Sequence, residues 1–451
     1  MQTIKQKRKH FSYDYLVSTV REAIRAKLVR EKNFEATLDA LMSAFAMLAF
    51  KYPSMLKFDE NFRQAAEPKL QNLERLFGIK RVPSDTYMRE LVDEQPVEIC
   101  HDPFKRVITL CQRGGALKQY FEYMDCYIIP VDGTGCFSSP SVHCEYCCIK
   151  EHKNGSTTYH HQMFAGAIVH PDQKVALPVI APEPIMNSDG AEKNDCERNA
   201  AKRWIARFRK DHPYLPVIIV ADGLSSNAPF IKVLREHNCN FILVCKDSDH
   251  EYLNNWVDAA DEEDAPTLDW HWVQGKKPNE RKMLKYQYMN DVPLNGSNFD
   301  CRVNVVRMWE LDPKSGKVTK WMWVTNLNVT LNNVAAIARA GRVRWKIENE
   351  TFNTLKNQGY EFEHNFGHGK KNLCNVLAIL MFLAFLIDQC MQRLNNLFQA
   401  AYAKEKSKAF LWEAIRGLLR RCILPSLDTM YKAVAEPPPP VDLRVLEAAP
   451  S

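Results

Sequence analysis

Two apolar runs in the middle of the chain end in the same way, each with an aspartate followed by a glycine. The first, Tyr127–Val131, leads into Asp132, and the second, Leu215–Ala221, leads into Asp222. Nearly uninterrupted apolar residues are typical of strands that are buried on both faces of a sheet. The sequence therefore predicts two core strands with an aspartate at the carboxyl end of each.

Further apolar runs and helical periodicities around these strands predict an α/β fold. The additional core strands are expected at Gln162–Val169, Val175–Ala181 and Asn240–Cys245, and the helices at Asp195–Arg209 and Ser225–Glu236. This order of elements is that of a ribonuclease-H-like core, in which the first and fourth strands are neighbours. Such neighbours would bring Asp132 and Asp222 together at the sheet edge where α/β proteins place ligands. Pro130 is unusual in a central strand, because proline donates no hydrogen bond to a ladder.

Helical patterns flank this core on both sides, and a β-rich segment of roughly four strands interrupts it. The expected divisions are a helical N-terminal domain (1–120), the core (121–265 and 330–392), the β-rich insertion (266–329), a basic helical region (393–434) and a disordered proline-rich tail (435–451). Small helical domains ahead of a catalytic core often bind DNA. A helical packing domain would have the same pattern.

Composition narrows the class of protein. The chain has 451 residues, 46% of them hydrophobic and 25% charged, as in globular proteins of two or three domains. Its longest apolar run, Val376–Ile387, is shorter than a membrane span and predicts a buried helix. The basic N-terminus is followed by no apolar run, so we expect no secretory signal. Fourteen cysteines in a chain of this length fit a reducing cytoplasm. The net charge of +6 permits an anionic partner without requiring one.

A third carboxylate is expected on a helix predicted at Gly341–Gly359. The apolar arc of this helix contains Trp345, Phe352 and Leu355. Glu348 falls inside that arc, whereas Glu350 lies almost opposite. A carboxylate on an apolar face costs several kcal/mol unless it is paired or binds a metal, which favours Glu348 as a metal ligand. The alternative is a surface helix with an ordinary Arg344–Glu348 ion pair.

The acidic residues lie in motifs that resemble those of bacterial insertion-sequence transposases of the DDE type. The similarity is to the insertion-sequence-four-like family, which has a β-strand insertion before its final glutamate. The matching motifs are Val131–Thr134, Ala221–Gly223, and Arg344–Glu348 with Lys356. In order and spacing they cover about residues 120–390. Two positions differ from the family pattern: Gly341 replaces a tyrosine, and the lysine lies one residue further from the glutamate.

The resemblance implies a DNA-cleaving and DNA-joining enzyme. Asp132, Asp222 and Glu348 would be its catalytic residues and would hold two Mg²⁺ or Mn²⁺ ions, while Arg344 and Lys356 would contact phosphates. The resemblance also implies cut-and-paste transposition by a dimer that acts on paired ends. Its partners are double-stranded DNA of the terminal inverted repeats and of the target, in the bacterial cytoplasm and nucleoid, with no membrane. The alternatives are a structure-specific nuclease on the same fold and an inactive transposase-derived DNA-binding protein.

Cysteines and histidines follow the first aspartate strand at metal-ligand spacing. Cys144 and Cys147 form a CxxC pair, and His152 and His160 lie within reach in the sequence. We therefore expect these four side chains to form a structural zinc site. Other candidate ligands are Cys136, His143 and His161. Free cytosolic cysteines beside a strand produce the same pattern, so the sequence leaves both interpretations open.

Three further groups also have two interpretations. Glu197 either supports the acidic site or belongs to a solvated helix face. His364 and His368 lie in a glycine-containing loop that either contacts DNA or caps a helix. Trp321 and Trp323 alternate along a predicted strand, where they either stack on a flipped base or pack in the core.

Overall fold

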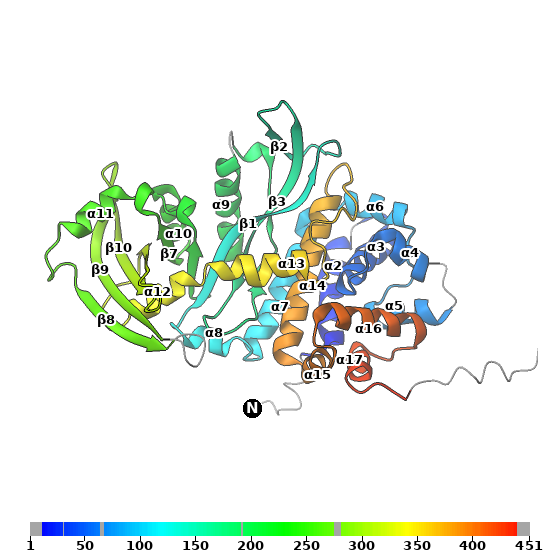
Figure 1. Ribbon diagram of the computed structural model, residues 1–451. Helices are drawn as coiled ribbons and strands as arrows, with labels where there is room; N and C mark the ends of the chain where they lie inside the picture. Colours follow the sequence, from blue (N-terminus) through cyan, green and yellow to red (C-terminus); the bar gives the residue numbers. More distant parts are fainter. Residues whose placement is uncertain (1–10, 30, 64–66, 191–192, 275–280, 440–451) are drawn as a thin grey trace, which may run out of the picture.

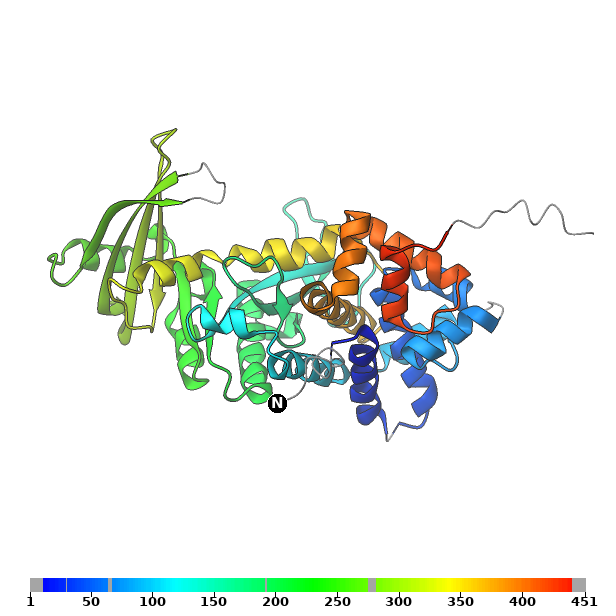
Figure 2. The ribbon, with the colours of Figure 1, turned by 90° about the horizontal axis from the view of Figure 1, so that it is seen from below.

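The protein is an α/β structure built on one mixed β-sheet of 11 strands. The computed structural model describes residues 11–29, 31–63, 67–190, 193–274 and 281–439. Helices cover the sheet and form a large body at one end of it, so that the molecule is elongated from the outer strands to the helical body (Figures 1 and 2). The α/β class expected from the sequence is therefore confirmed.

The centre of the sheet holds both of the apolar strands that lead into an aspartate. The core strands are β1 (Tyr127–Ser139), β3 (Thr157–Ile168), β6 (Val217–Ala221) and β7 (Asn240–Cys245). The short strands β2 (Cys148–Glu151), β4 (Leu177–Pro178) and β5 (Glu183–Ile185) all pair with β3. Strand β1 is antiparallel to β3 and parallel to β6, which is in turn parallel to β7. The two aspartate strands are thus neighbours, as predicted. The prediction that the first of them ends at Asp132 is wrong, because β1 continues to Ser139 and only its pairing with β6 stops before the aspartate.

Pro130 is accommodated at a gap in the ladder between β1 and β3. The two strands pair at Ile128 with Val169 and again at Val131 with Gly166. The β3 residues between these points pair with β4 instead. The proline therefore lies where β1 has lost its partner on that side, which explains how a central strand tolerates it.

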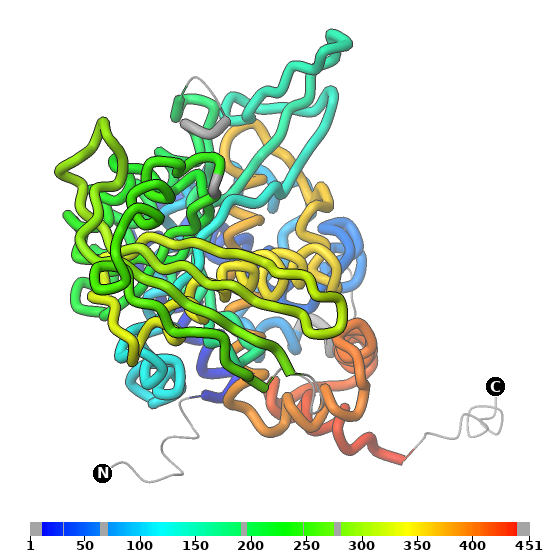
Figure 3. Tube along the Cα trace, turned by 60° about the vertical axis from the view of Figure 1, so that its left-hand side comes forward, coloured from blue at the N-terminus to red at the C-terminus, as the bar shows by residue number. Residues whose placement is uncertain are grey.

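The four strands of the predicted insertion continue the core sheet. They are β8 (Thr267–Gln274), β9 (Arg281–Asn295), β10 (Asn298–Leu311) and β11 (Val318–Thr325). Strand β11 pairs antiparallel with β7, and β10, β9 and β8 follow outward in that order. Figure 3 shows these long strands side by side at the front of the molecule. Hydrogen bonding from β7 to β11 makes the insertion an extension of the core.

Helices lie on both sides of the sheet. The bounds are α9 (Lys193–Asp211), α10 (Ala228–Glu236), α11 (Glu251–Asp258), α12 (Val334–Arg342) and α13 (Asn353–Asn357). In Figure 2, α12 and α13 run along one side of the core strands, and α9 and α10 lie on the other. The two helices predicted between the core strands are thus confirmed as α9 and α10.

Helices from the two ends of the chain form one packed body. The N-terminal helices are α2 (Tyr13–Leu28), α3 (Phe34–Ala49), α4 (Met55–Phe62), α5 (Glu67–Phe77), α6 (Asp85–Asp93), α7 (His101–Arg113) and α8 (Lys118–Glu122). The C-terminal helices are α14 (Leu373–Leu394), α15 (Asn396–Glu405), α16 (Lys408–Arg421) and α17 (Leu427–Ala435). The rings of Tyr13 and Tyr431 lie 5.8 Å apart, and the Asn72 amide donates to the Cys422 carbonyl at 2.8 Å. Figure 1 shows the blue and the orange to red helices interleaved.

The helix α14 runs through the centre of this body. By length and composition it could cross a membrane, but 94% of its most apolar window is buried inside the protein. Such burial is typical of a core helix, which agrees with the buried helix expected from the sequence. The predicted disordered tail begins where α17 ends, and its residues 440–451 lie outside the described part of the chain.

A buried ion pair joins the N-terminal and C-terminal helices. The Lys51 ammonium pairs with the Asp388 carboxylate, and the two side chains are 0% and 3% exposed. The ammonium lies 3.9 Å from the centre of the Trp412 ring and 4.6 Å from that of Tyr360. The Tyr360 hydroxyl donates to the same carboxylate at 2.6 Å. Four separate segments of the chain therefore meet at one charge pair.

Candidate acidic site and cysteine–histidine cluster

The parallel pairing of β1 and β6 sets the two aspartates side by side. The last paired positions are Pro130 and Val220, and Asp132 and Asp222 each lie two residues further. Side chains two residues apart on a strand point to the same face, so both carboxylates project on one side of the sheet. The Asp132 carboxylate accepts a hydrogen bond from the Gly133 amide at 2.8 Å, and that of Asp222 accepts one from Leu224 at 3.1 Å.

Burial and neighbouring negative charges raise the pKa of Asp132 to about 7. Burial is the largest cause, and its side chain is only 19% exposed. The charges of Glu197 and Asp222 and a hydrogen bond with Glu348 raise the pKa further, while the Gly133 amide opposes them. A carboxylate held this close to three others is one of the arrangements that mark functional sites.

Arg344 is the cation that lies among these carboxylates. Its Nη1 donates to Glu348 Oε1 at 2.6 Å and to Asp132 Oδ2 at 3.3 Å. Burial lowers the pKa of Arg344, but Glu348, Asp132 and Asp222 raise it more, so the net pKa lies above its usual value. The i, i+4 ion pair weighed as the alternative to a functional Glu348 is present, and it is part of the acidic site.

The segment that carries Glu348 is not the regular α-helix that was predicted. Helix α12 ends at Arg342, and the π-helix η5 (Ile347–Phe352) comes between it and α13. Its buried residues are Ile347, Thr351 and Phe352. The side chain of Glu348 is 48% exposed, so the prediction that it lies on the buried face is wrong. A π turn contains more residues than an α-helical turn, so the side chains after it point in different directions from those predicted for a regular helix. Such turns are frequent at functional sites.

Glu197 on α9 is a fourth carboxylate of this site. A methyl group on Gly133 would approach the Glu197 carboxyl carbon to 3.0 Å, so the glycine leaves room for the close approach. The sequence favoured a solvated helix face for this residue. Its position depends on how α9 packs on the sheet, which no local pattern contains.

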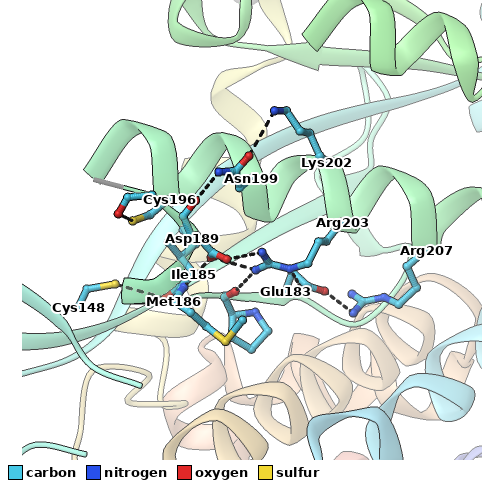
Figure 4. A network of polar contacts seen from close by, with 12 residues as sticks. Cys148, Glu183, Ile185, Met186, Asp189, Cys196, Asn199, Lys202, Arg203 and Arg207 are labelled. Carbon is cyan, nitrogen blue, oxygen red and sulfur yellow. Dashed lines mark hydrogen bonds and ion pairs between the residues drawn. The ribbon is translucent and has the colours of Figure 1, made fainter. Parts of the chain in front are cut away.

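Salt bridges to the short strand β5 hold α9 in place. Arg203 Nε donates to Glu183 at 2.8 Å and its other nitrogens bind Asp189, while Arg207 donates to the second Glu183 oxygen at 2.5 Å. Figure 4 shows both guanidinium groups pointing from the helix toward these carboxylates. Forked contacts of this kind fix orientation as well as position. They orient the helix whose first turns present Glu197.

The other residues expected at the acidic site face elsewhere. Lys356 Nζ pairs with Glu363 at 2.7 Å. Glu350 lies toward the helical body, where its charge acts on Lys408. Burial lowers the pKa of Lys408, and the negative charges of Asp388 and Glu350 partly offset that effect. Of the two predicted phosphate-binding residues, the structure brings only Arg344 into contact with the acidic trio.

A cavity of about 300 Å³ with basic lining residues lies beside the acidic site. Its lining residues are Gly190, Arg198, Asn199, Lys202, Asn227, Pro229 and Phe230. A smaller cavity next to it shares Arg198 and Phe230 and reaches Glu197. Positive and negative side chains thus follow one another along α9.

Trp323 packs in the core, which was one of the two interpretations of its position. It is 1% exposed, and a methyl group on Gly341 would lie 2.6 Å from its indole nitrogen. The Trp323 ring therefore occupies the space that a side chain at position 341 would need. Trp321 is stacked under the Arg342 guanidinium, 4.2 Å from its ring centre.

Two cysteines and two histidines form a compact cluster. The potential ligand atoms of Cys144, Cys147, His161 and His368 all lie within 4.8 Å of one another, and such a group can hold a metal ion such as zinc. Burial raises the pKa of the Cys144 thiol, but the hydrogen bond and charge of His161 lower it more, so its net pKa is below the usual value. The CxxC pair was predicted correctly.

The prediction of His152 and His160 as the histidine ligands is wrong. His152 Nε2 instead bonds the Thr158 hydroxyl at 2.8 Å. His160 and His161 are consecutive on β3, so their side chains point to opposite faces, and it is His161 that faces the cysteines. The alternation of side chains along a strand predicts that only one of these two histidines can face the cysteines. It does not predict which one, because the sequence does not show on which face of the sheet the cysteines lie. His368 comes from a distant loop that only the tertiary structure brings near.

Comparison with known proteins adds no family to these observations. No protein-family model matches the chain, and no curated protein matches its sequence. What defines the protein is therefore its mixed sheet, the acidic cluster where the pairing of β1 with β6 ends, and the cysteine–histidine cluster.

Proposed function

We propose that this protein is a DNA transposase of the DDE type. The observation that carries the proposal is the grouping of Asp132, Asp222 and Glu348 around Arg344, just beyond the last paired positions of the parallel strands β1 and β6. The enzyme would cleave DNA at the ends of an insertion element and transfer the freed strands into target DNA. The motif resemblance and the acidic geometry support the same three residues independently.

The strand arrangement supports a ribonuclease-H-like core for this enzyme. Strand β1 pairs with the antiparallel strand β3 on one side and with the parallel strand β6 on the other, and β6 pairs in turn with the parallel strand β7. Short strands β4 and β5 add a third antiparallel position next to β3. In our proposal the core binds DNA at its acidic edge, and β8–β11 extend this platform.

The acidic site fits hard divalent cations. Asp132, Asp222 and Glu348 offer only oxygen donors, the ligands that Mg²⁺ and Mn²⁺ prefer. Burial, together with the nearby charges of Glu197 and Asp222, raises the pKa of Asp132. Two such ions would activate the attacking hydroxyl and stabilise the leaving oxygen. The three carboxylates would hold and orient these ions. Arg344 orients two of the carboxylates and presents a charged fork that suits a phosphate.

The DNA partner would be the inverted repeats of the element and the target duplex. Arg198 and Lys202, which line the cavity beside Glu197, are placed to follow a phosphate backbone away from the acidic site. Lys356 can take part if it exchanges Glu363 for a phosphate. Binding through such contacts weakens steeply with salt. We expect a homodimer on paired ends in a bacterial cytoplasm.

The test compares DNA cleavage and strand transfer for the wild type, Glu348→Gln and Glu350→Gln. The substrate is DNA that carries the inverted repeats flanking the gene, with Mg²⁺ present. Excision and joining that are lost in Glu348→Gln but kept in Glu350→Gln are the expected result. The second variant is a matched control, because it removes the same charge two residues away on the side of Lys408.

Other outcomes would assign a different function. Cleavage without joining would make the protein a structure-specific nuclease, and end binding with neither reaction would make it a DNA-binding relic. Cleavage that survives in Glu348→Gln would overturn the proposed site.

A further inference from the structure

We propose that Cys144, Cys147, His161 and His368 bind one structural zinc ion, independently of the metals at the acidic site. This ion would fasten the loop that follows the Glu348 segment to the β1–β2 turn and to strand β3. The ligand set consists of two thiols and two imidazoles, which favours zinc over magnesium or calcium.

The distances within the cluster match a tetrahedral site. Zinc–sulfur bonds of about 2.3 Å and zinc–nitrogen bonds of about 2.0–2.1 Å separate two sulfurs by about 3.8 Å and a sulfur from a nitrogen by about 3.5 Å. The two sulfur atoms of Cys144 and Cys147 are 3.9 Å apart. Cys144 Sγ lies 3.3 Å from His161 Nε2, and Cys147 Sγ lies 3.5 Å from His368 Nε2. Three edges of the tetrahedron are thus already present.

A neighbouring amide orients one of the histidines. His161 Nδ1 lies 3.0 Å from Asn375 Oδ1, and both side chains are buried. Because an amide oxygen can only accept, Nδ1 carries the proton and the Nε2 lone pair faces the cysteines. Hydrogen bonding at the second ring nitrogen is typical of histidines that ligate metals. The Phe137 ring packs 4.3 Å from that of His368 and closes the site on another side.

The loop that supplies His368 is held independently from its other side. Four consecutive backbone amides, those of residues 370–373, donate to the Asp93 carboxylate at the end of α6. Gly369, with φ +71°, allows this approach, because a methyl group there would collide with Asp93. Zinc on His368 would therefore tie the hairpin of β2 and β3 to the helical body through a loop that is already rigid on the helical side.

A thiol–imidazole nucleophile is the competing interpretation of part of this cluster. Cys144, His161 and Asn375 have the order of groups that activates a cysteine. That chemistry has no use for Cys147 and His368, which lie equally close. The second cysteine–histidine pair therefore favours a metal.

The experiment measures metal content on the full-length protein. We expect about one zinc per chain after purification in chelator-free buffer. After exchange into Co²⁺ we expect the visible absorption of tetrahedral cobalt thiolate. Cys147→Ser and His368→Gln should each lose the bound zinc and the cobalt spectrum. His152→Gln and His160→Gln are matched controls and should keep both.

Two further measurements keep the proposal falsifiable. If Cys147→Ser or His368→Gln does not fold, Cys144→Ser at the half-buried position replaces it. Glu348→Gln should retain zinc, which separates this proposal from that of the acidic site. Purified wild-type protein that contains no stoichiometric zinc and shows no tetrahedral cobalt spectrum would overturn the site, as would zinc that survives loss of His368. A thiol at Cys144 that reacts rapidly with alkylating reagent in a zinc-free wild type would favour the nucleophile.

Discussion

At the scale of single residues, Asp132 combines burial with close negative neighbours. Its carboxylate is stabilised by one backbone amide and a longer contact to Arg344, and it is opposed by Glu197, Asp222 and Glu348. Carboxylates that are grouped to bind cations repel one another when no cation is bound. Such a site therefore lowers the stability of the fold.

The first prediction concerns Asp132→Asn in magnesium-free buffer. A carboxyl with a pKa of about 7 when folded binds more protons than in the unfolded chain, so its contribution to stability falls as pH rises from about 4 to about 7. Asparagine removes this effect, and we expect the variant to be more stable at pH 8 by on the order of 2–4 kcal/mol, with a smaller gain at pH 5. Urea unfolding at both pH values measures it. A variant less stable than the wild type at pH 8 would contradict the crowding argument.

A second residue makes the protein sensitive to acid. His101 on α7 is packed against Arg207, whose Nη1 lies 3.0 Å from the imidazole Nε2. Burial, together with the charges of Arg207 and Lys27, lowers the pKa of His101 to about 3. The folded protein therefore holds this imidazole neutral, whereas the unfolded chain protonates it below its usual pKa.

The second prediction follows from that difference in proton binding. Stability should fall as pH drops below about 6.5, with a loss from this residue of about 3 kcal/mol at pH 4. His101→Gln keeps an acceptor for Arg207 but cannot titrate. Its loss of stability between pH 7 and pH 4 should therefore be smaller than that of the wild type by about 3 kcal/mol. Chemical denaturation at the two pH values tests this. Equal losses in both proteins would refute it.

At the scale of elements, the structure differs most from expectation in the segment between α12 and α13. A regular helix was predicted from Gly341 onward, and the chain forms a π turn around Glu348 instead. The end of α12 is positioned by close packing of Gly341 on Trp323. Replacement of a helical glycine by alanine normally stabilises a protein, so this contact can be tested by the sign of the effect.

The third prediction compares Gly341→Ala with Gly417→Ala. Gly341 lies in α12, where a methyl group would meet the Trp323 ring at 2.6 Å, and we expect a loss of about 1–3 kcal/mol. Gly417 lies in α16 with nothing within 4 Å of the added methyl, and we expect a gain of about 0.5–1 kcal/mol. Thermal and urea unfolding measure both. Stabilisation by both substitutions would show that Trp323 can move aside.

At the scale of the whole molecule, the helices from the two ends of the chain are interdependent. The pair Lys51–Asp388 joins the end of α3 to α14 and is enclosed by Tyr360 and Trp412. A buried pair of this kind need not add net stability, but removal of one partner leaves an uncompensated charge. We therefore expect that removal of the N-terminal helices would also destabilise the C-terminal ones.

The fourth prediction is that Lys51→Met destabilises the protein by about 3–5 kcal/mol and that Lys51→Met with Asp388→Leu recovers much of the loss. The matched control is Lys57→Met, which breaks an exposed pair with Glu60 whose side chains are both 53% exposed. It should change stability by less than about 1 kcal/mol. Equilibrium unfolding of the four proteins measures the coupling. A mild effect of Lys51→Met alone would mean that Asp388 is neutral in the folded protein.

The features that were predicted from sequence depend on short-range patterns. Continuous apolar runs identified β6 and the first half of β1, helical periodicity identified α9, α10 and α14, and the CxxC spacing identified two of the four clustered ligands. Each of these signals lies within one element, because burial on one or both faces imposes its own period on the residues of that element.

The remaining features arise from contacts between elements that are distant in the chain. His368 meets the CxxC pair only because α6 and α14 hold its loop beside β3, and Glu197 reaches Asp132 only because salt bridges to β5 orient α9. The pairing of β11 with β7, which continues the sheet into the insertion, is likewise set by hydrogen bonds across the fold. The contact partners of these side chains and strands are therefore set by how the whole chain packs. The residues next to them in the sequence do not determine those partners.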